Sequence, residues 1–351
     1  MQILSKFIIP WRIKHFLRQK FNQINFCKNN LLNSRRQNNH SLNILFYRDY
    51  DGFSGGSLAV SKIASMLSTF ANIDLLTTST RNLNQHFQGE VKLIRQIKKK
   101  YDLIIFDDST PAADILNYKI YAHQSLVTCH CLYDECHGRI PEEMLLTLKT
   151  CDYVHFVDEC QQESFSMLQT NIFVIPNAVD QVIKNNFTQN LGCVGDLNQQ
   201  RKNVHTTIDI FEKSHATELQ LWTCQQDFIS AKKIISHKNW EFNKSKIYNS
   251  FDVLIFLSKA ETFGLVIAEA LSAGVPCVIS DIPAFRHYKK CDAVKIIAPN
   301  DIESGIKWAN DFLLNKEQLR ENAVSFWNNN YRASIITSMW KKKILEIISQ
   351  G

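Results

Sequence analysis

One stretch in the second half of the chain constrains the fold more than any other. It opens with an apolar, β-rich run, Phe251–Leu257, and continues after a polar loop into Leu265–Ala273, where apolar residues recur at helical spacing. Gly274-Val275-Pro276 ends this helix, because glycine suits a helix C-cap and proline cannot continue a helix. A new apolar run, Val275–Ser280, follows. Strand, helix and strand in this order predict a βαβ unit in a parallel sheet.

Two glutamates lie in the loop and helix of this unit. Glu261 and Glu269 are separated by seven residues, and Gly264 lies between them near the helix N-terminus. Ligands of α/β folds bind at the carboxyl ends of the strands, and helix N-termini attract phosphates. Carboxylates accept hydrogen bonds from sugar and ribose hydroxyls. The segment therefore predicts a nucleotide-sugar site, with an ordinary amphipathic helix bearing surface glutamates as the alternative.

The string S-x-x-E-T-F-G-L-x-x-x-E-A-L-x-x-G-x-P, from Ser258 to Pro276, resembles a known family. It is similar to the E-x7-E region of retaining GT-B glycosyltransferases of the family-4 type, glycosyl transferases group 1. The resemblance covers about Leu42 to Ile348 and implies an α/β protein with the GT-B fold, two Rossmann-like doubly wound domains facing a central cleft. It implies that Glu261 contacts the transferred sugar and Glu269 the ribose. The other donor-site residues it implies here are Ser258, Thr262, Phe263, Gly264 and Leu265.

Residues 195–203 resemble the loop of the same family that neutralises the donor diphosphate. Gly195 and Lys202 match the pattern, whereas Asp196 stands where the family has an arginine. The departing diphosphate accumulates negative charge, so cations at this loop would stabilise it. Either Arg201 supplies the second cation from a shifted position or the donor is held more weakly. A solvated basic pair before a helix is the alternative.

Three further candidates lie in the first half of the chain. His130 ends the strand S-L-V-T-C-H and resembles the family's histidine that faces the donor sugar. Gly55-Gly56 resembles the glycine loop near the acceptor and the donor phosphates, where the backbone can approach a ligand closely. Asp51, in the same loop, is a candidate for acceptor hydroxyls. A structural histidine, an ordinary turn and a solvated carboxylate are the alternatives. Among all the candidates named so far, Glu261, His130 and Lys202 are those that we expect to take part in catalysis.

The apolar runs and the charge pattern, together with the resemblance for the acceptor and donor roles, predict four regions. They are a basic amphipathic arm (1–40), a Rossmann-like acceptor domain (41–180), a Rossmann-like donor domain (190–330) and a C-terminal helix (331–351), which by resemblance crosses back to the first domain. Within the acceptor domain we expect a helix over Ser57–Phe70 after the two glycines. We also expect a helical stretch that ends in Lys98-Lys99-Lys100.

The positive charge of the chain is concentrated at its N-terminus. The formal net charge is +6, but the first 40 residues hold eight Lys or Arg and no acidic residue, which leaves 32 basic and 34 acidic residues in the remainder. Apolar clusters alternate with these cations, as in segments that lie on anionic membranes; a loosely packed extension is the alternative. We expect a cytoplasmic protein that contacts the inner face of the membrane peripherally. A slightly acidic body argues against nucleic acid as a partner.

The ten cysteines form no C-x-x-C pair, which favours a reducing compartment. Cys129, His130 and Cys131 with Cys136 and His137 could supply soft ligands to zinc. Alternation along a strand, however, sends His130 to the face opposite the two cysteines. We therefore expect no metal at these residues. The resemblance implies no cofactor, with a nucleoside-diphosphate sugar as co-substrate.

Together these features predict a retaining, metal-independent glycosyltransferase. It would move a sugar from a nucleoside-diphosphate sugar to a hydroxyl of a glycan or lipid-linked acceptor, in bacterial envelope polysaccharide or lipopolysaccharide synthesis. Two alternatives remain open. A GT-B-fold sugar-nucleotide epimerase would share the donor site, and Asp196 leaves room for a non-catalytic sugar-nucleotide-binding partner of another transferase.

Overall fold

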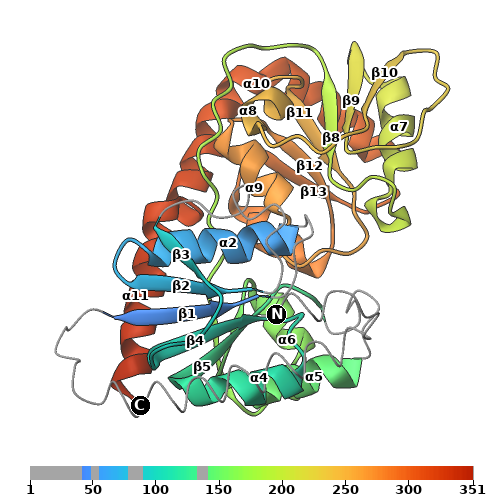
Figure 1. The fold of residues 1–351 in the computed structure, drawn as a ribbon. Coiled ribbons are helices and arrows are strands. Elements are labelled where there is room, and N and C mark those ends of the chain that lie inside the picture. Colours follow the sequence, from blue (N-terminus) through green and yellow to red (C-terminus); the bar gives the residue numbers. More distant parts are fainter. Residues whose placement is uncertain (1–41, 49–54, 78–89, 133–140, 351) are drawn as a thin grey trace, which may run out of the picture. The chain divides into compact units, whose positions relative to one another are not determined.

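The computed structural model describes residues 42–48, 55–77, 90–132 and 141–350. They divide into two compact units (Figure 1). Unit 1 holds the described residues up to Phe156, together with Phe165–Phe173 and those from Trp340 on; unit 2 holds Val157–Ser164 and Val174–Met339. The basic arm, Asp51, and Cys136 with His137 lie outside the described residues.

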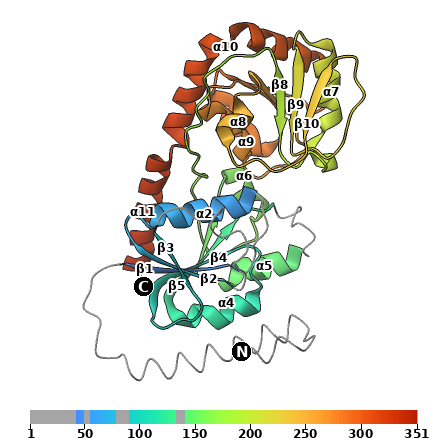
Figure 2. The ribbon, with the colours of Figure 1, turned by 45° about the horizontal axis from the view of Figure 1, so that its top comes forward.

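Unit 1 is built on a seven-stranded sheet in the described residues, with the order β3-β2-β1-β4-β5-β6-β7. Every pair from β3 to β6 is parallel. The helix α2 covers one face, and α4 and α5 cover the other (Figures 1 and 2). The elements are β1 (Asn43–Tyr47), α2 (Gly55–Leu67), β2 (Asn72–Leu76), β3 (Val91–Ile94), β4 (Tyr101–Asp107), α4 (Ala112–Tyr118), β5 (Ala122–Cys129), α5 (Pro141–Thr150), β6 (Tyr153–Phe156) and β7 (Asn171–Val174).

Continuous apolar runs explain the central strands of unit 1. Leu103, Ile104, Ile105 and Phe106 of β4 are fully buried, as expected for a parallel strand covered on both faces. The order of the strands reverses between β1 and β4, so their carboxyl ends flank a topological switch point, where α/β sheets bind ligands.

Unit 2 repeats the architecture with six parallel strands in the described residues, ordered β10-β9-β8-β11-β12-β13. Its strands are β8 (Leu191–Val194), β9 (Glu218–Trp222), β10 (Lys233–His237), β11 (Val253–Phe256), β12 (Cys277–Ser280) and β13 (Val294–Ile297). Its helices are α6 (Glu159–Ser164), η4 (Gln200–Lys202), α7 (Val204–Lys213), α8 (Lys244–Tyr248), α9 (Leu265–Ser272), η5 (Pro283–Lys290) and α10 (Ile302–Asn330). The last helix, α11 (Ala333–Ser349), begins in unit 2 and ends in unit 1.

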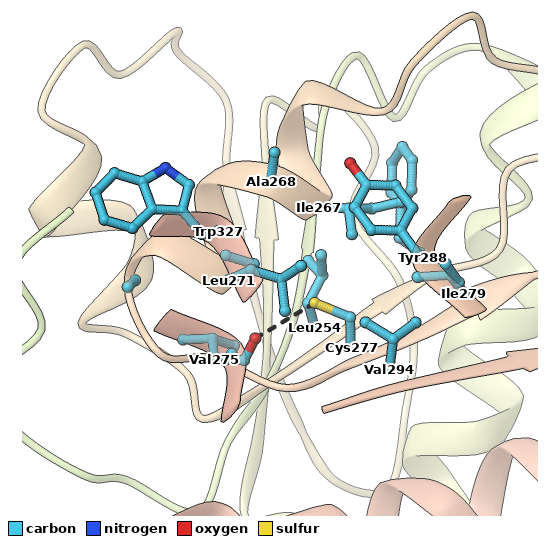
Figure 3. Packing of buried hydrophobic residues seen from close by; sticks show 14 of the residues in the cluster. Leu254, Ile267, Ala268, Leu271, Val275, Cys277, Ile279, Tyr288, Val294 and Trp327 are labelled. Atoms are coloured by element: carbon cyan, nitrogen blue, oxygen red, sulfur yellow. Dashed lines mark hydrogen bonds between the residues drawn. The ribbon is translucent and has the colours of Figure 1, made fainter. Parts of the chain in front are cut away.

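Alternation along the strands of unit 2 makes two separate cores. Leu254 and Phe256 belong to the cluster beneath α9, whereas Val253 and Ile255 belong to the cluster beneath α7 and α10. Successive side chains of a strand point to opposite faces, so one apolar run supplies both layers. Figure 3 shows the first cluster, in which Cys277 donates a 3.3 Å hydrogen bond from Sγ to the carbonyl of Val275. This cysteine packs as a small apolar side chain.

A buried ion network holds the segment of residues 181–190 in place within unit 2. Lys184 and Asp252 are 2% and 0% exposed at their side chains and lie 3.1 Å apart. Lys316 of α10 approaches the other oxygen of Asp252 at 2.6 Å. Buried charges are tolerated when they are paired and hydrogen-bonded, so this network fixes the segment in place.

Two expectations for secondary structure were wrong. Residues 91–94 form the edge strand β3, paired with β2, and not part of a helix. Because this strand is half-exposed at the edge of the sheet, its sequence lacks the apolar run by which the central strands can be predicted. The helix expected from Ser57 begins two residues earlier, which places Gly55 and Gly56 in the first turn of α2 and not in the preceding loop.

The βαβ unit expected between Phe251 and Ser280 is confirmed as β11, α9 and β12. Among the described residues, no helix is long and apolar enough to cross a membrane.

Candidate active site

The loop between β11 and α9 reaches the carboxyl edge of the unit 2 sheet through a glycine. Gly264 caps α9 with a φ of +78°, in the left-handed region that side chains disfavour. A Cβ at this position would lie 2.7 Å from Cε1 of Phe285, so a larger residue does not fit without a shift. The glycine therefore sets the direction in which the helix leaves the loop.

Glu261, in this loop, is paired with two cations. Its Oε1 accepts hydrogen bonds from Lys202 Nζ and, at 3.3 Å, from Arg201 Nη1. The side chains of Glu261 and Lys202 are 13% and 9% exposed, and the ammonium of Lys202 lies 4.9 Å from the centre of the Phe256 ring. Partial burial strengthens these charge interactions relative to those of a surface pair.

Arg201 and Lys202 lie in the loop that follows β8. Gly195 has a φ of +135°, and the short helix η4 then carries Arg201 and Lys202. The two loops are bonded to each other, since Lys259 N donates to the carbonyl of Arg201 at 2.8 Å and Arg201 Nη1 donates to the carbonyl of Ala260 at 2.6 Å. The structure therefore brings Gly195, Arg201, Lys202 and Glu261 together.

Asp196, which departs from the family pattern, is satisfied within its own loop. Its carboxylate accepts hydrogen bonds from Asn198 Nδ2 at 3.0 Å and Gln199 Nε2 at 2.8 Å. Gln199 in turn accepts from Arg201 Nε at 2.8 Å. The aspartate is thus bonded to neutral amides, and Arg201 is the second cation beside Lys202.

Glu269 lies one turn into α9 and is held at both oxygens. The hydroxyl of Tyr248 donates to Oε2 at 2.8 Å, and Lys244 Nζ lies 3.0 Å from Oε1. Burial, and next the charge of Glu269, raise the pKa of Tyr248 well above its usual range, so this hydroxyl keeps its proton. Sequence analysis missed both partners. The available signal was their four-residue spacing, which puts them on one face of α8.

The remaining donor-site candidates differ in exposure. Ser258 is buried, and its Oγ donates within the loop to the carbonyl of Ala260 at 3.1 Å. Phe263 is 4% exposed and stacks on His287 with ring centres 5.6 Å apart. These two side chains therefore shape the loop from inside, whereas Thr262 and Leu265 are half-buried.

His130 follows β5 at the carboxyl edge of the unit 1 sheet. Its backbone N–H donates to Asp108 Oδ2 at 2.7 Å, and its Nε2 lies 3.1 Å from Thr128 Oγ1. The same hydroxyl lies 2.8 Å from Nδ1 of the buried His155. Burial lowers the pKa of His130; the carboxylate of Asp108 opposes this effect and Arg48 adds to it. The imidazole is therefore held toward its neutral form.

Two buried ionisable side chains at the same edge of the sheet as His130 were not anticipated from the sequence. Arg48, after β1, donates from Nη1 to Ser61 Oγ at 3.0 Å on α2. Asp107, at the end of β4, accepts from the backbone of Ser109 at 3.0 Å. Burial, and next the charge of Asp108, raise the pKa of Asp107. The ends of β1, β4 and β5 thus gather polar groups at the switch point of unit 1.

Of the zinc candidates, Cys136 and His137 lie outside the described residues. Cys129 and Cys131 are buried, and Cys129 Sγ donates to the carbonyl of Cys131 at 3.6 Å. In the described residues, no three His, Cys, Asp or Glu side chains are placed to hold a metal ion.

Solved structures share this architecture. A sucrose-phosphate synthase from Thermosynechococcus elongatus superposes with a TM-score of 0.69 at 13% identity, covering 88% of this chain and 100% of its own. HepE of Anabaena in complex with UDP-glucose gives 0.70 at 16% identity, over 88% and 100%. The lipopolysaccharide outer core galactosyltransferase WaaB gives 0.61 at 13%, over 87% and 99%. At such identities the likeness establishes the fold, which is GT-B: two α/β units, each on a parallel sheet.

Part of the sequence of unit 2 is similar to one protein family. Residues 184–326 match the model of the family described as Glycosyl transferases group 1. The match includes Lys202, Glu261 and Glu269. Among curated protein sequences none matches the chain. The chain therefore has the GT-B fold, and its residues 184–326 are similar to the Glycosyl transferases group 1 family.

Proposed function

We propose that the chain transfers a sugar, with retention and without a metal ion, from a nucleoside-diphosphate sugar to a hydroxyl of a glycan or lipid-linked acceptor. The observation that carries this proposal is the grouping of Lys202, Arg201 and Glu261 at the N-terminus of α9, one turn before Glu269. Cations and free backbone N–H groups suit a diphosphate, and the two carboxylates suit hydroxyls.

Lys202 and Arg201 would stabilise the leaving group. The transition state places growing negative charge on the departing diphosphate, and fixed cations are most effective there because they need no reorganisation. Arg201 adds a planar fork that can bind two phosphate oxygens at once, so it can replace the arginine that Asp196 displaces. The departing phosphate oxygen would then accept the proton of the acceptor hydroxyl.

Glu261 and His130 are proposed to bind the transferred sugar. A neutral imidazole can both accept and donate a hydrogen bond, and the lowered pKa of His130 favours this form. Glu261 is already aligned by two cations, so its remaining acceptor sites have a fixed direction. We assign both residues to sugar binding and neither to proton removal from a nucleophile.

We propose an envelope polysaccharide or lipopolysaccharide as the product. HepE binds UDP-glucose and WaaB is a lipopolysaccharide galactosyltransferase, and both share the fold of this chain. The basic, apolar composition of residues 1–40 suits peripheral contact with an anionic membrane that carries a lipid-linked acceptor.

A non-catalytic sugar-nucleotide-binding protein is the second candidate, and Asp196 favours it. An exposed carboxylate at the diphosphate loop would repel a donor unless its amide partners and Arg201 compensate. Such a protein would bind a donor without turning it over.

A panel of nucleotides tests the proposal. We would measure the melting temperature with UDP, GDP, ADP and CMP, with and without Mg²⁺, for wild type and Glu269→Ala. A ligand that binds only the folded state raises the melting temperature. We expect a shift with one nucleoside diphosphate, unaffected by Mg²⁺ and lost in Glu269→Ala. Glu241→Ala is the matched control, because Glu241 also pairs with a lysine of α8 but is bonded to Lys246.

Turnover separates the two candidates. Release of the nucleoside diphosphate from the donor sugar that carries the selected base would support the transferase. Binding of that donor without release, with or without membrane glycolipid added, would favour the binding protein. No shift with any nucleotide would contradict both.

A further inference from the structure

We propose that Tyr248 and Lys244 are positioning residues that orient the carboxylate of Glu269 to accept both hydroxyls of the nucleotide ribose. This inference rests on the proposed function, in which Glu269 binds the ribose. In this proposal α8, a helix of five residues, affects which nucleotides bind because it orients Glu269.

Tyr248 and Lys244 each contact a different oxygen of the Glu269 carboxylate. Tyr248 donates its hydroxyl to Oε2 at 2.8 Å, and Lys244 approaches Oε1 at 3.0 Å. Lys244 and Tyr248 are four residues apart in α8 and therefore lie on one helix face. Each oxygen of Glu269 thus has its own protein partner.

This division leaves an arrangement that matches a vicinal diol. An ionised carboxylate offers about four acceptor positions, two on each oxygen. One partner on each oxygen leaves one position free on each, so two neighbouring hydroxyls can be bound side by side. A carboxylate without these partners could rotate about its last bond and present the positions in other directions.

The side chain of Tyr248 is held in place by its own contacts, so it can hold the carboxylate of Glu269 in one orientation. Its side chain is 0% exposed, and its ring lies 5.6 Å from that of Phe251 in an edge contact. Its carbonyl accepts a hydrogen bond from Lys184 at 3.1 Å. The hydroxyl also lies 3.1 Å from the carbonyl of Val266 in α9, which ties α8 to the helix that carries Glu269.

The test compares a nucleoside diphosphate with its 2′,3′-dideoxy analogue, using the base selected by the melting panel. Calorimetry would give the ratio of the two dissociation constants for wild type, Glu269→Gln, Tyr248→Phe and Lys244→Met. Wild type should prefer the ribonucleotide by about 10- to 100-fold, since two hydroxyls lose a charged acceptor in the analogue. Tyr248→Phe and Lys244→Met should each reduce this preference about tenfold, while binding of the dideoxy analogue changes little.

Two variants serve as matched controls. Tyr101→Phe removes another buried tyrosine hydroxyl that donates to a carboxylate, Asp74, at 2.7 Å in unit 1. Lys246→Met removes the neighbouring lysine of α8, which pairs with Glu241. Both should keep the wild-type preference, even where Tyr101→Phe lowers the melting temperature as much as Tyr248→Phe does. Lys244→Arg should retain the preference.

The outcomes separate this inference from the proposed function. Equal affinity of wild type for both ligands would overturn the ribose role of Glu269 and, with it, this inference. A preference that Glu269→Gln abolishes but Tyr248→Phe and Lys244→Met leave intact would overturn the positioning role alone. If Tyr248→Phe fails to fold, Lys244→Met still decides, because Lys244 is 31% exposed and can be replaced without opening the core.

Discussion

The two sheets bring charges to their carboxyl edges in different ways. In unit 2, Glu261 is paired with Lys202 and Arg201, and these three side chains are 13%, 9% and 28% exposed. In unit 1, Asp107 is buried, has a raised pKa and is bonded mainly to Ser109 and Thr110. The carboxyl edges of the two sheets therefore differ although the architecture is the same. Unit 2 presents a carboxylate paired with cations, and unit 1 presents a buried carboxyl group bonded to neutral groups.

Under the proposed function, this difference predicts that unit 2 receives the charged part of the donor. A diphosphate can exchange with a carboxylate as the partner of a lysine and an arginine, and unit 2 offers both cations together. The polar cluster of unit 1, with a neutral imidazole and a carboxyl inclined to hold a proton, suits neutral hydroxyls. Fold alone does not distinguish the units, and the loop residues do.

The largest expected effect contrasts one substitution in each unit. Asp252→Asn removes the charge between Lys184 and Lys316, and leaving a buried cation unpaired should lower the free energy of unfolding by about 3–5 kcal/mol. Asp107→Asn should change it by less than about 1 kcal/mol, because asparagine keeps an oxygen that accepts from Ser109 and Thr110, and burial raises the pKa of Asp107 toward the neutral form. Urea unfolding of both variants is the measurement. Equal destabilisation would remove the contrast between the units.

Turnover gives the next largest effect. Lys202→Ala should reduce kcat about 10²- to 10³-fold, because it removes a cation aimed at the leaving group. Lys99→Ala, which breaks a lysine–aspartate pair with Asp74 in unit 1, should leave kcat near the wild-type value. Steady-state release of the nucleoside diphosphate would be measured for both. A Lys202→Ala enzyme within a few-fold of wild type would show that unit 2 does not hold the diphosphate through this residue.

The glycines of the two units should respond in opposite directions. Gly264→Ala should cost about 1–3 kcal/mol of unfolding free energy, because φ is +78° and the new Cβ meets Phe285. Gly56→Ala lies in the first turn of α2 and should be neutral or stabilising by up to about 1 kcal/mol. Thermal unfolding would measure both. If Gly56→Ala nevertheless reduces turnover, the close backbone approach expected at Gly55-Gly56 is supported; unchanged turnover would make these residues ordinary helix positions.

A pH effect at His130 should be the smallest. Its folded pKa lies below the unfolded value of about 6.5, so the unfolded state takes up the proton first. Stability should therefore fall as the pH drops through about 6.5 toward the folded pKa, by at most about 1.4 kcal/mol per pH unit. His130→Gln should remove this slope between pH 8 and 5 in urea unfolding. A slope of the opposite sign would mean that the protonated form is favoured by Asp108.

Much of unit 2 could be predicted from sequence because its signals are local. An apolar run, a glycine at the helix start and Gly274 before Pro276 define β11, α9 and β12 within thirty residues. The resemblance added the roles of Glu261 and Glu269 on the same short segment. Unit 1 was predicted less completely: β3 is a half-exposed edge strand without a continuous apolar run, and the pattern at Lys98-Lys99-Lys100 indicated a helix instead.

The sequence by itself determined the alternation of strands and helices and the spacing of the two glutamates, because both depend on neighbouring residues. Only the tertiary structure decided which side chains meet them. Arg201 and Lys202 reach Glu261 across about sixty residues, and Tyr248 reaches Glu269 from a helix too short to show periodicity. Such contacts depend on the order of strands in a sheet, and no local pattern records that order.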